Sequence, residues 1–283
     1  MKRKLSVRET IAVASLLFGL FFGAGNLIFP VHMGQMAGSS SPAAILGFCI
    51  TAVGLPLMAI AAMAISRSES LAQLAGRVGK GYGLFFSCLL YLTIGPFFAI
   101  PRCASTSFTV GVAPLVSEGQ ARLWLLLFSL AFFALVLWFS LRPNGILTYV
   151  GKIINPVFLV FLFLLVIASL ANPMAGLREL PPEGNYETQA FITGFLEGYN
   201  TMDILAALAF GITIVQVIKD LGIENAGDVA GNSFRAGIFS SLLMAVIYAL
   251  ITVMGAASRG VYPTSENGGI ALTQIAAHYF GAL

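Results

Sequence analysis

The chain has 283 residues, of which 58% are hydrophobic and only 10% are charged, and its formal net charge at pH 7 is +3. Its mean hydropathy is +0.91. A soluble domain carries about 25% charged residues, so this composition excludes a globular surface that faces water. No basic patch is interleaved with aromatic residues, which argues against nucleic-acid binding. We therefore expect an all-α integral membrane protein that forms a single membrane domain.

Seven apolar segments are long enough to cross a bilayer, which requires roughly 20 residues. Because backbone groups in lipid must find partners within the segment, each one is predicted to be helical. In chain order they cover residues 10–33, 43–65, 83–112, 123–140, 150–171, 190–218 and 233–257. The first follows four basic residues and is longer than a signal-peptide core, so we expect it to be retained as a span.

Basic residues are distributed unevenly between the two ends of the predicted spans. With the N-terminus inside, three of the 15 lysines and arginines lie at outer positions, namely Arg122, Arg178 and Arg259, and Arg102 lies within a span. The inner positions hold the other eleven, which are Lys2, Arg3, Lys4, Arg8, Arg67, Arg77, Lys80, Arg142, Lys152, Lys219 and Arg235. The positive-inside rule therefore predicts a cytoplasmic N-terminus.

The chain continues beyond the seventh span with a Pro- and Gly-containing turn. Residues 270–280 then carry apolar side chains at near-helical spacing, which predicts a short amphipathic helix on the outer face. The chain stops at Leu283 with neither a polar tail nor a basic closing loop. We expect a truncated chain.

Motifs for soluble chemistry are missing from the sequence. Cys49, Cys88 and Cys103 lie in apolar segments without metal-ligand spacing, and we expect them to be packing residues. The Gly-rich run at residues 76–83 lacks the spacing of a phosphate loop. A membrane enzyme is one rival class, but it would need a cluster of nucleophiles, bases or metal ligands. A channel is the other rival, and it predicts no saturable, gradient-coupled uptake.

Span one contains a polar, glycine-rich interruption at residues 22–26, Phe-Gly-Ala-Gly-Asn. Each glycine lowers helix propensity by about 1 kcal/mol. A break here would leave carbonyls of the first half-helix and N–H groups of the second without partners, ready for a cation and a carboxylate. The alternative is a packing face, because Gly19 and Gly23 form a GxxxG pair.

Span six contains a second interruption at residues 197–203, Glu-Gly-Tyr-Asn-Thr-Met-Asp. An ionised Asp at a span centre costs about 2.5–3.5 kcal/mol, so such residues usually face a cavity or a partner. The alternative is hydrogen bonding between helices without transport. Spans one and six are five apart, and an odd number of spans inverts the second copy. This predicts a five-span repeat at residues 1–172 and the first two spans of an inverted repeat at residues 173–283.

Arg102 is the only basic residue well inside a predicted span, and Glu197 lies at a similar depth from the outer end. Because an unpaired charge at that depth is expensive, we hypothesise that the two form an ion pair. The alternative is an Arg102 side chain that extends to the outer interface.

Four runs give the chain a family resemblance over residues 8–280. They are LLFGLFFGAGNLIFP, AVGLPL, GPFFAIPR and GYNTMD. They resemble the bacterial branched-chain amino-acid carriers, the leucine-isoleucine-valine:cation symporters, which are similar to transporters with the five-plus-five inverted-repeat fold. The resemblance implies import of leucine, isoleucine and valine across the bacterial cell membrane, driven by Na⁺ or H⁺. Family members are longer, and this chain ends just before the eighth span, which in the related fold supplies hydroxyl ligands to one cation site.

The residues and the resemblance together predict one site. The substrate carboxylate is expected at the N–H groups near Gly25 and Asn26, and the amino group at carbonyls of spans one and six. The predicted substrate-binding residues are Phe22, Gly23, Ala24, Gly25, Asn26, Tyr199, Asn200, Thr201 and Met202. The predicted cation ligands are Gly19, Phe22, Asn26, Thr201 and Asp203. An apolar pocket for the side chain is expected from Phe97, Phe98, Met202 and Phe210.

No cofactor is implied beyond the coupling ion, and no obligatory protein partner is evident. Two alternative functions are an inactive truncated fragment of such a carrier and a carrier for another small neutral solute. Because one methyl group alters binding only modestly, the sequence does not rank leucine, isoleucine and valine.

Overall fold

The computed structural model describes residues 4–66, 68, 70–141 and 155–281, and every element in these ranges is helical. The main helices are α1 Val7–Phe21, α2 Gly25–Ala37, α3 Ser41–Cys49, α4 Leu55–Ser66, α5 Leu71–Gly76, α6 Lys80–Leu92, α7 Ala99–Gly111, α8 Ala121–Ser140, α10 Asn155–Ala171, α11 Tyr186–Asn200, α12 Asp203–Asp220, α13 Ala226–Ser258 and α14 Gly268–Phe280. Short 3₁₀ turns cover Gly38–Ser40, Ala113–Leu115, Glu118–Gln120 and Leu177–Glu179, and π-helical turns cover Ile50–Gly54 and Thr93–Phe97.

Four continuous helical stretches of the described residues could cross a membrane by length and composition, and the bent pair α11 and α12 makes a fifth. The four are Gly25–Ser66, Lys80–Leu115, Ala121–Ser140 and Ala226–Ser258. The fold class of an all-α membrane protein is therefore confirmed, whereas the count of seven spans stays a prediction. The predicted span at residues 150–171 is helical from Asn155, and residues 150–154 lie outside the described residues.

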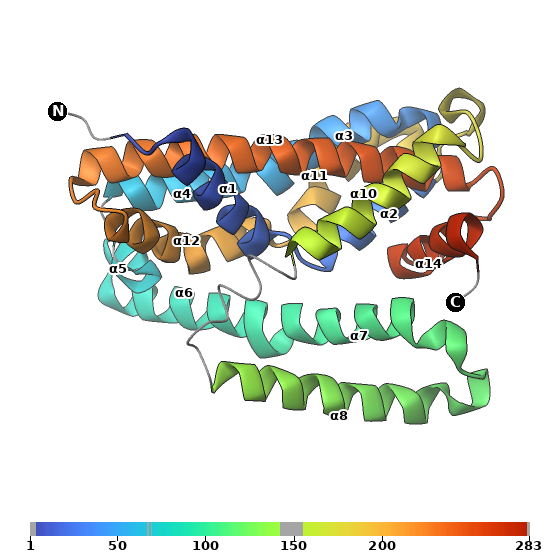
Figure 1. Cartoon of the computed structure of the whole chain (residues 1–283), viewed down its shortest axis with the longest axis horizontal. Helices are drawn as coiled ribbons and strands as arrows, with labels where there is room; N and C mark the ends of the chain where they lie inside the picture. The colour runs from blue at the N-terminus through green and yellow to red at the C-terminus, as the bar shows by residue number, and fades with distance from the viewer. Residues whose placement is uncertain (1–3, 67, 69, 142–154, 282–283) are drawn as a thin grey trace.

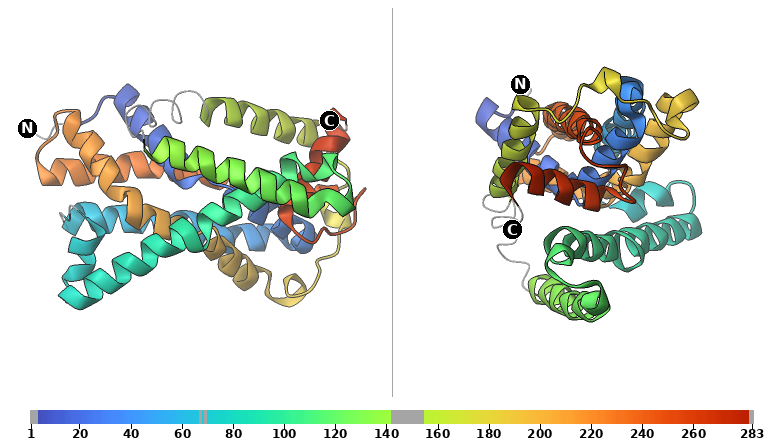
Figure 2. Two further views of the ribbon diagram at one scale, coloured as in Figure 1. Left: turned by 90° about the horizontal axis from the view of Figure 1, so that it is seen from below. Right: turned by 90° about the vertical axis from the view of Figure 1, so that its right-hand side faces the viewer.

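The helices form a large group and a thinner layer (Figures 1 and 2). Helix α13, about 50 Å long at 1.5 Å per residue, runs through the large group and contacts α1, α2, α3, α4 and α12. Helices α6, α7 and α8 form the layer on the other side (Figure 1). No residue of α8 is buried, which fits a helix that faces lipid.

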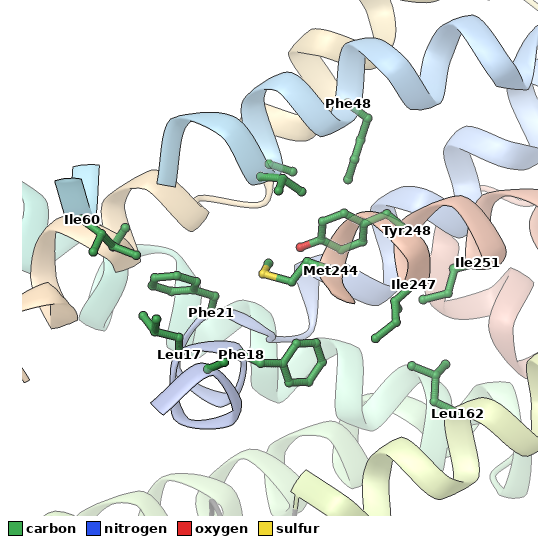
Figure 3. Packing of buried hydrophobic residues seen from close by; sticks show 14 of the residues in the cluster. Leu17, Phe18, Phe21, Phe48, Ile60, Leu162, Met244, Ile247, Tyr248 and Ile251 are labelled. Atoms are coloured by element: carbon green, nitrogen blue, oxygen red, sulfur yellow. The ribbon is translucent and has the colours of Figure 1, made fainter. Parts of the chain in front are cut away.

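The core of the large group surrounds Tyr248, whose side chain is fully buried. Its ring packs edge-on against Phe48, with ring centroids 5.1 Å apart, and α1 contributes Phe18 and Phe21 to the same cluster (Figure 3). The cluster therefore joins α1, α3 and α13 at the level where span one is broken.

Glycines allow two helix pairs to approach with their backbones in contact. A Cβ atom at Gly34 of α2 would lie 2.0 Å from the carbonyl oxygen of Thr252 in α13, and Gly255 is equally close to α2. Gly47 of α3 and Gly194 of α11 make the same kind of contact with each other's helix. Packing by small residues is typical of helices in lipid, where the apolar medium provides no driving force.

The two predicted breaks are confirmed. Helix α1 ends at Phe21, Phe22 is extended with ψ 105°, and α2 begins at Gly25. Helix α11 ends at Asn200, and Met202 has a positive φ of 66° before α12 begins, with a bend of 42°. The packing alternative for Gly19 and Gly23 is not supported at Gly23, because the nearest atom to an added Cβ there is Asn26 Oδ1 at 3.7 Å.

A third break in span three was not predicted. The backbone leaves helical geometry at Gly95, with φ −91° and ψ −115°, and at Phe98, with φ −136° and ψ −65°. Pro96 lies between them and lacks a backbone donor, so the i→i−4 ladder is interrupted there. Span three is therefore divided into α6 and α7.

The predicted helix at residues 270–280 is confirmed as α14, with Asn267 accepting hydrogen bonds from the N–H groups of Gly269 and Ile270 as its cap. Its buried face includes Leu272 and Ile275, and it packs on α2 and α7. Its position at the outer face stays a prediction.

Candidate functional site

A cavity of about 390 Å³ lies where the three broken spans meet. Its walls come from the end of α1, the start of α2, the break of span three, and the junction of α11 and α12. The lining residues are Leu20, Phe21, Gly23, Ala24, Gly25, Asn26, Tyr91, Ile94, Gly95, Ala99, Ile100, Arg102, Cys103, Thr201, Met202, Asp203, Ala206 and Phe210. The structure therefore brings the two predicted motifs together around one space.

Asp203, Asn26 and Tyr248 form a buried hydrogen-bonded triad beside this cavity. Asn26 Nδ2 donates to Asp203 Oδ2 at 2.7 Å, and the Tyr248 hydroxyl donates to the same oxygen at 2.9 Å. Asn26 Nδ2 also lies within hydrogen-bonding contact of the Tyr248 hydroxyl oxygen. The exposed fractions of Asp203, Asn26 and Tyr248 are 3%, 2% and 0%. A buried hydrogen-bond network therefore connects α2, α12 and α13.

The local sequence explains why Asp203 is tolerated in this position. It is the first residue of α12, where the helix dipole is positive and favours an anion. Its N–H group lies 3.5 Å from the Thr201 hydroxyl oxygen, and that hydroxyl donates to the carbonyl of Gly198 at 2.8 Å. Asp203 Oδ2 accepts two hydrogen bonds, whereas Oδ1 accepts none from the described residues. One carboxylate oxygen therefore remains available.

Asn26 also holds the end of the break in span one. Its Oδ1 accepts a hydrogen bond from the N–H group of Gly23 at 2.7 Å, and its own N–H group donates to the carbonyl of Gly23 at 3.1 Å. The amides of Ala24 and Gly25 donate to no acceptor among the described residues. Two amides at the start of α2, those of Ala24 and Gly25, are therefore available for the predicted anion site, whereas the Asn26 amide is already used; the binding of an anion there stays a prediction.

Carbonyl groups at the end of α1 are also available. Those of residues 19–22 accept no hydrogen bond from the described residues, as expected for the last turn of a helix. The predicted carbonyl ligands Gly19 and Phe22 belong to this set, although neither residue lines the cavity. Their binding of a cation stays a prediction.

Arg102 reaches the junction of α11 and α12 from α7. Its Nη1 donates to the carbonyl of Asn200 at 2.8 Å, and its Nη2 donates to the carbonyl of Thr201 at 3.3 Å. The guanidinium carbon lies 5.3 Å from the ring centroid of Phe29. Gly25 makes room for this side chain, because an added Cβ would lie 2.9 Å from Arg102 Nη2.

The hypothesised ion pair between Arg102 and Glu197 is not found between these two described residues. Glu197 lies one turn before the end of α11, and Arg102 instead binds the last carbonyls of that helix. These carbonyls carry the negative end of the helix dipole, so they provide two acceptors for the guanidinium without a carboxylate. Extension of Arg102 to the outer interface is also not observed.

Some predicted substrate contacts do not line the cavity. The side chains of Tyr199, Phe97 and Phe98 are 51%, 67% and 57% exposed, and none of the three is part of the wall. The non-helical backbone at Gly95 and Phe98 explains why the two phenylalanines are not in the wall, because it changes the direction in which their side chains point. Met202 and Phe210 do line the cavity, as predicted.

The predicted carbonyl contacts on α11 are occupied. The carbonyl of Tyr199 accepts a hydrogen bond from the N–H group of Met202 at 3.1 Å, and those of Asn200 and Thr201 accept from Arg102. Phe22 does not line the cavity and packs instead against the rings of Phe18 and Tyr248.

Sequence analysis missed Tyr248 and the inner part of span three. Tyr248 is a single phenol inside the long apolar run of α13, and a lone hydroxyl in lipid is the signal that could have pointed to a buried partner. Ile94 and Gly95 could have been found from Pro96, because a proline inside a helix predicts a break at the residues before it.

Comparisons with known proteins agree with these features. Residues 6–283 match the family model described as "Branched-chain amino acid transport protein". The branched-chain amino acid permease BrnQ of Lactobacillus delbrueckii subsp. lactis is 49% identical over 284 residues, which is 100% of this chain and 64% of that protein. The permease BrnQ of Bacillus subtilis strain 168 is 42% identical over 282 residues, with the same coverage of 100% and 64%.

The permease BrnQ of Escherichia coli strain K12 is 37% identical over 281 residues, covering 99% of this chain and 63% of that protein. The chain thus spans slightly less than two thirds of the length of the curated relatives that it matches. No solved structure matches the chain. With a family model that covers nearly all of its residues and relatives at 37–49% identity, the chain belongs to the branched-chain amino acid transport protein family.

Proposed function

We propose that this protein is a secondary transporter that imports leucine, isoleucine or valine with a coupling cation, Na⁺ or H⁺, across the bacterial cell membrane. The observation that carries the proposal is the cavity at the junction of the broken spans, with a buried carboxylate on its wall. The names of the relatives, branched-chain amino acid permeases, supply the substrate class. The volume of 390 Å³ falls within the usual range of about 300–1,000 Å³ for small-molecule sites.

The substrate fits this cavity in one orientation. Its carboxylate would accept hydrogen bonds from the unused amides of Ala24 and Gly25, where the dipole of α2 is positive. Its aliphatic side chain would lie against the apolar wall, which includes Phe21, Ile94 and Phe210. Its ammonium group would lie between the unused carbonyls at the end of α1 and the carbonyls of Asn200 and Thr201, which Arg102 binds in this structure.

The coupling cation would act at Asp203. The carboxylate has one oxygen that accepts no hydrogen bond from the part of the chain that the structure describes, and Asp203 lines a cavity that Asn26 and Thr201 also line. A proton could bind that oxygen directly, and a sodium ion would need further oxygens from the carbonyls of residues 19–22. Either ion would neutralise a buried charge that is otherwise stabilised only by neutral donors and by Arg102 nearby.

The contacts between helices support the inverted repeat. If α1 and α2 correspond to α11 and α12, and α3 with α4 corresponds to α13, then each contact in one repeat should have a counterpart. Helix α2 packs on α13 as α12 packs on α4, and α11 packs on α3 as α1 packs on α13. The two cross-contacts, α2 with α11 and α1 with α12, are also exchanged by this correspondence.

The two ends of the molecule support the proposed orientation. The ends of α4 and α12 meet the start of α13 around a small cavity, and the N–H group of Leu5 donates to Asn232 of α13 at 3.0 Å. This end carries Lys219 and Lys4, which precedes Leu5. We propose that it faces the cytoplasm.

Uptake in proteoliposomes tests the function. We expect wild-type protein to accumulate radiolabelled leucine when an inward Na⁺ or H⁺ gradient is imposed, and unlabelled isoleucine and valine to compete. Arg122→Ala, on the exposed start of α8 and outside the cavity, serves as the control that retains uptake. Absence of gradient-dependent accumulation by a well-folded wild type would refute the proposal, and uptake through an ungated pore would show no saturation.

A further inference from the structure

The position of Arg102 relative to the cavity suggests a role beyond binding. On α1 and α12 the lining extends along the helices, and on α12 it continues from Asp203 to Phe210, two turns into the helix. On α2 the lining does not extend beyond Asn26, and at α11 it includes only Thr201, which directly follows the helix. The cavity therefore extends along α1 and α12, and its lining ends where α2 and α11 meet Arg102.

Arg102 lies at that end of the lining and contacts the other two broken spans. From α7 it crosses beneath the second turn of α2, where it contacts Phe29, and it binds the carbonyls of Asn200 and Thr201 at the end of α11. Arg102 lines the cavity, whereas its partners Phe29 and Asn200 do not, so the guanidinium lies at the boundary of the cavity between α2 and α11.

The bonds that hold Arg102 are suited to release. Both acceptors are backbone carbonyls at a helix end rather than a carboxylate, and the Nε atom is buried and has no hydrogen-bond partner among the described residues. A buried donor without an acceptor offsets part of what the other bonds contribute. The same two carbonyls can accept an ammonium group, so the arginine and a substrate would compete for them.

We propose that Arg102 is a gate residue, a tethered cation that closes the α2 and α11 side of the site and must leave the carbonyls of Asn200 and Thr201 for the site to open to that side. This inference rests on the proposed function for its substrate. It makes two independent statements: the bonded arginine lowers the apparent affinity for the amino acid, and it blocks passage of solutes from one face of the membrane.

The first statement is tested by direct binding of radiolabelled leucine to purified protein. The apparent affinity of a site falls by the fraction of molecules in the competent state, so Arg102→Ala should bind leucine about twofold more tightly if the bonded form is populated at about 50%, and about tenfold more tightly at about 90%. Arg122→Ala removes an exposed arginine outside the cavity and should bind as wild type does. Weaker binding by Arg102→Ala than by wild type would overturn the gate and make Arg102 a contact of the substrate carboxylate.

The second statement is tested without any substrate. Cys103 lines the cavity, and with Cys49→Ser and Cys88→Ser it becomes the only thiol. A membrane-impermeant thiol reagent applied to one face of proteoliposomes should label Cys103 of the otherwise wild-type protein only from the face that carries the N-terminus. Arg102→Ala should add labelling from the opposite face, and labelling that stays restricted to one face would overturn the proposal.

A second variant and a comparison of the two measurements distinguish failure of the gate from failure of the proposed substrate. Phe29→Leu removes the aromatic face under the guanidinium while it keeps an apolar side chain, so it should move binding and labelling in the same direction by a smaller amount even if Arg102→Ala does not fold. Wild-type protein that binds no branched-chain amino acid but shows the expected labelling pattern would overturn the proposed substrate and leave the gate standing. No change in either measurement with Phe29→Leu and Arg102→Ala overturns the gate.

Discussion

Replacement of Tyr248 by phenylalanine is the sharpest test of the buried triad. The ring is fully buried and packs against Phe48 at 5.1 Å and Phe22 at 6.2 Å, so Tyr248→Phe keeps the packing and removes one oxygen. Asp203 Oδ2 would lose a donor at 2.9 Å and keep the one from Asn26 at 2.7 Å. A hydrogen bond to a charged group contributes about 1.5–3 kcal/mol to stability.

The expected loss is measurable as a shift in thermal unfolding of the detergent-solubilised protein. At about 2–4 °C per kcal/mol for a chain of this size class, Tyr248→Phe should melt about 3–12 °C below wild type. Tyr279→Phe is the matched control, because the Tyr279 hydroxyl donates to the carbonyl of Asn172 at 2.8 Å in an exposed position. A neutral bond of that kind contributes about 0.5–1.5 kcal/mol, so the control should shift less.

Equal shifts for the two variants would refute the claim that the triad stabilises a buried charge. A higher melting temperature for Tyr248→Phe would refute it more strongly, because it would mean that Asp203 does not use the hydroxyl. Asn26→Leu is not a suitable substitute for this test, since Asn26 also accepts the N–H group of Gly23 and its loss would disturb the break itself.

Three further predictions follow from contacts in the fold and the cavity. Gly34→Ala should lower the melting temperature because a Cβ would lie 2.0 Å from a backbone oxygen of α13. Overpacking of this kind typically costs about 1–3 kcal/mol or more. Gly231→Ala, where an added Cβ would have no atom within 4 Å, should leave the melting temperature unchanged. Asp203→Asn should abolish gradient-driven leucine accumulation in proteoliposomes while exchange of internal for external leucine persists; accumulation equal to wild type would contradict a role in coupling. Phe210→Ala should raise the leucine concentration needed for half-maximal uptake, and Phe97→Ala, outside the cavity, should not; the reverse order would contradict the assigned wall.

Backbone interruptions were the features that the sequence predicted best. Glycine at positions 23 and 25, followed by an asparagine, lowers helix propensity at one place in span one, and the chain breaks there. In span six the cluster of polar residues predicted the break, which occurs at Met202 in a left-handed conformation. Local chemistry was sufficient in both spans because a break needs only weak helix formers and polar groups that require partners.

Tertiary partners were harder to predict, because they depend on how helices are rotated. Tyr248 lies 45 residues from Asp203 and 222 from Asn26, and no spacing rule relates them. Phe97 and Phe98 were expected in the pocket because they lie near the right depth. The break at Gly95 rotates them away from it, and the rotation of a segment after a π-turn is not encoded in residue spacing.

The error over Arg102 shows which part of a burial argument is reliable. The premise that a cation inside a span requires a partner was correct, since the guanidinium binds two carbonyls and an aromatic face. The position along span six was also nearly correct, because Glu197 lies one turn from the carbonyls that are used. The assumption that failed was that the partner must be a charged side chain. A helix that ends inside the membrane exposes carbonyls with a partial negative charge, so the break that sequence analysis predicted in span six had already created the partner for Arg102.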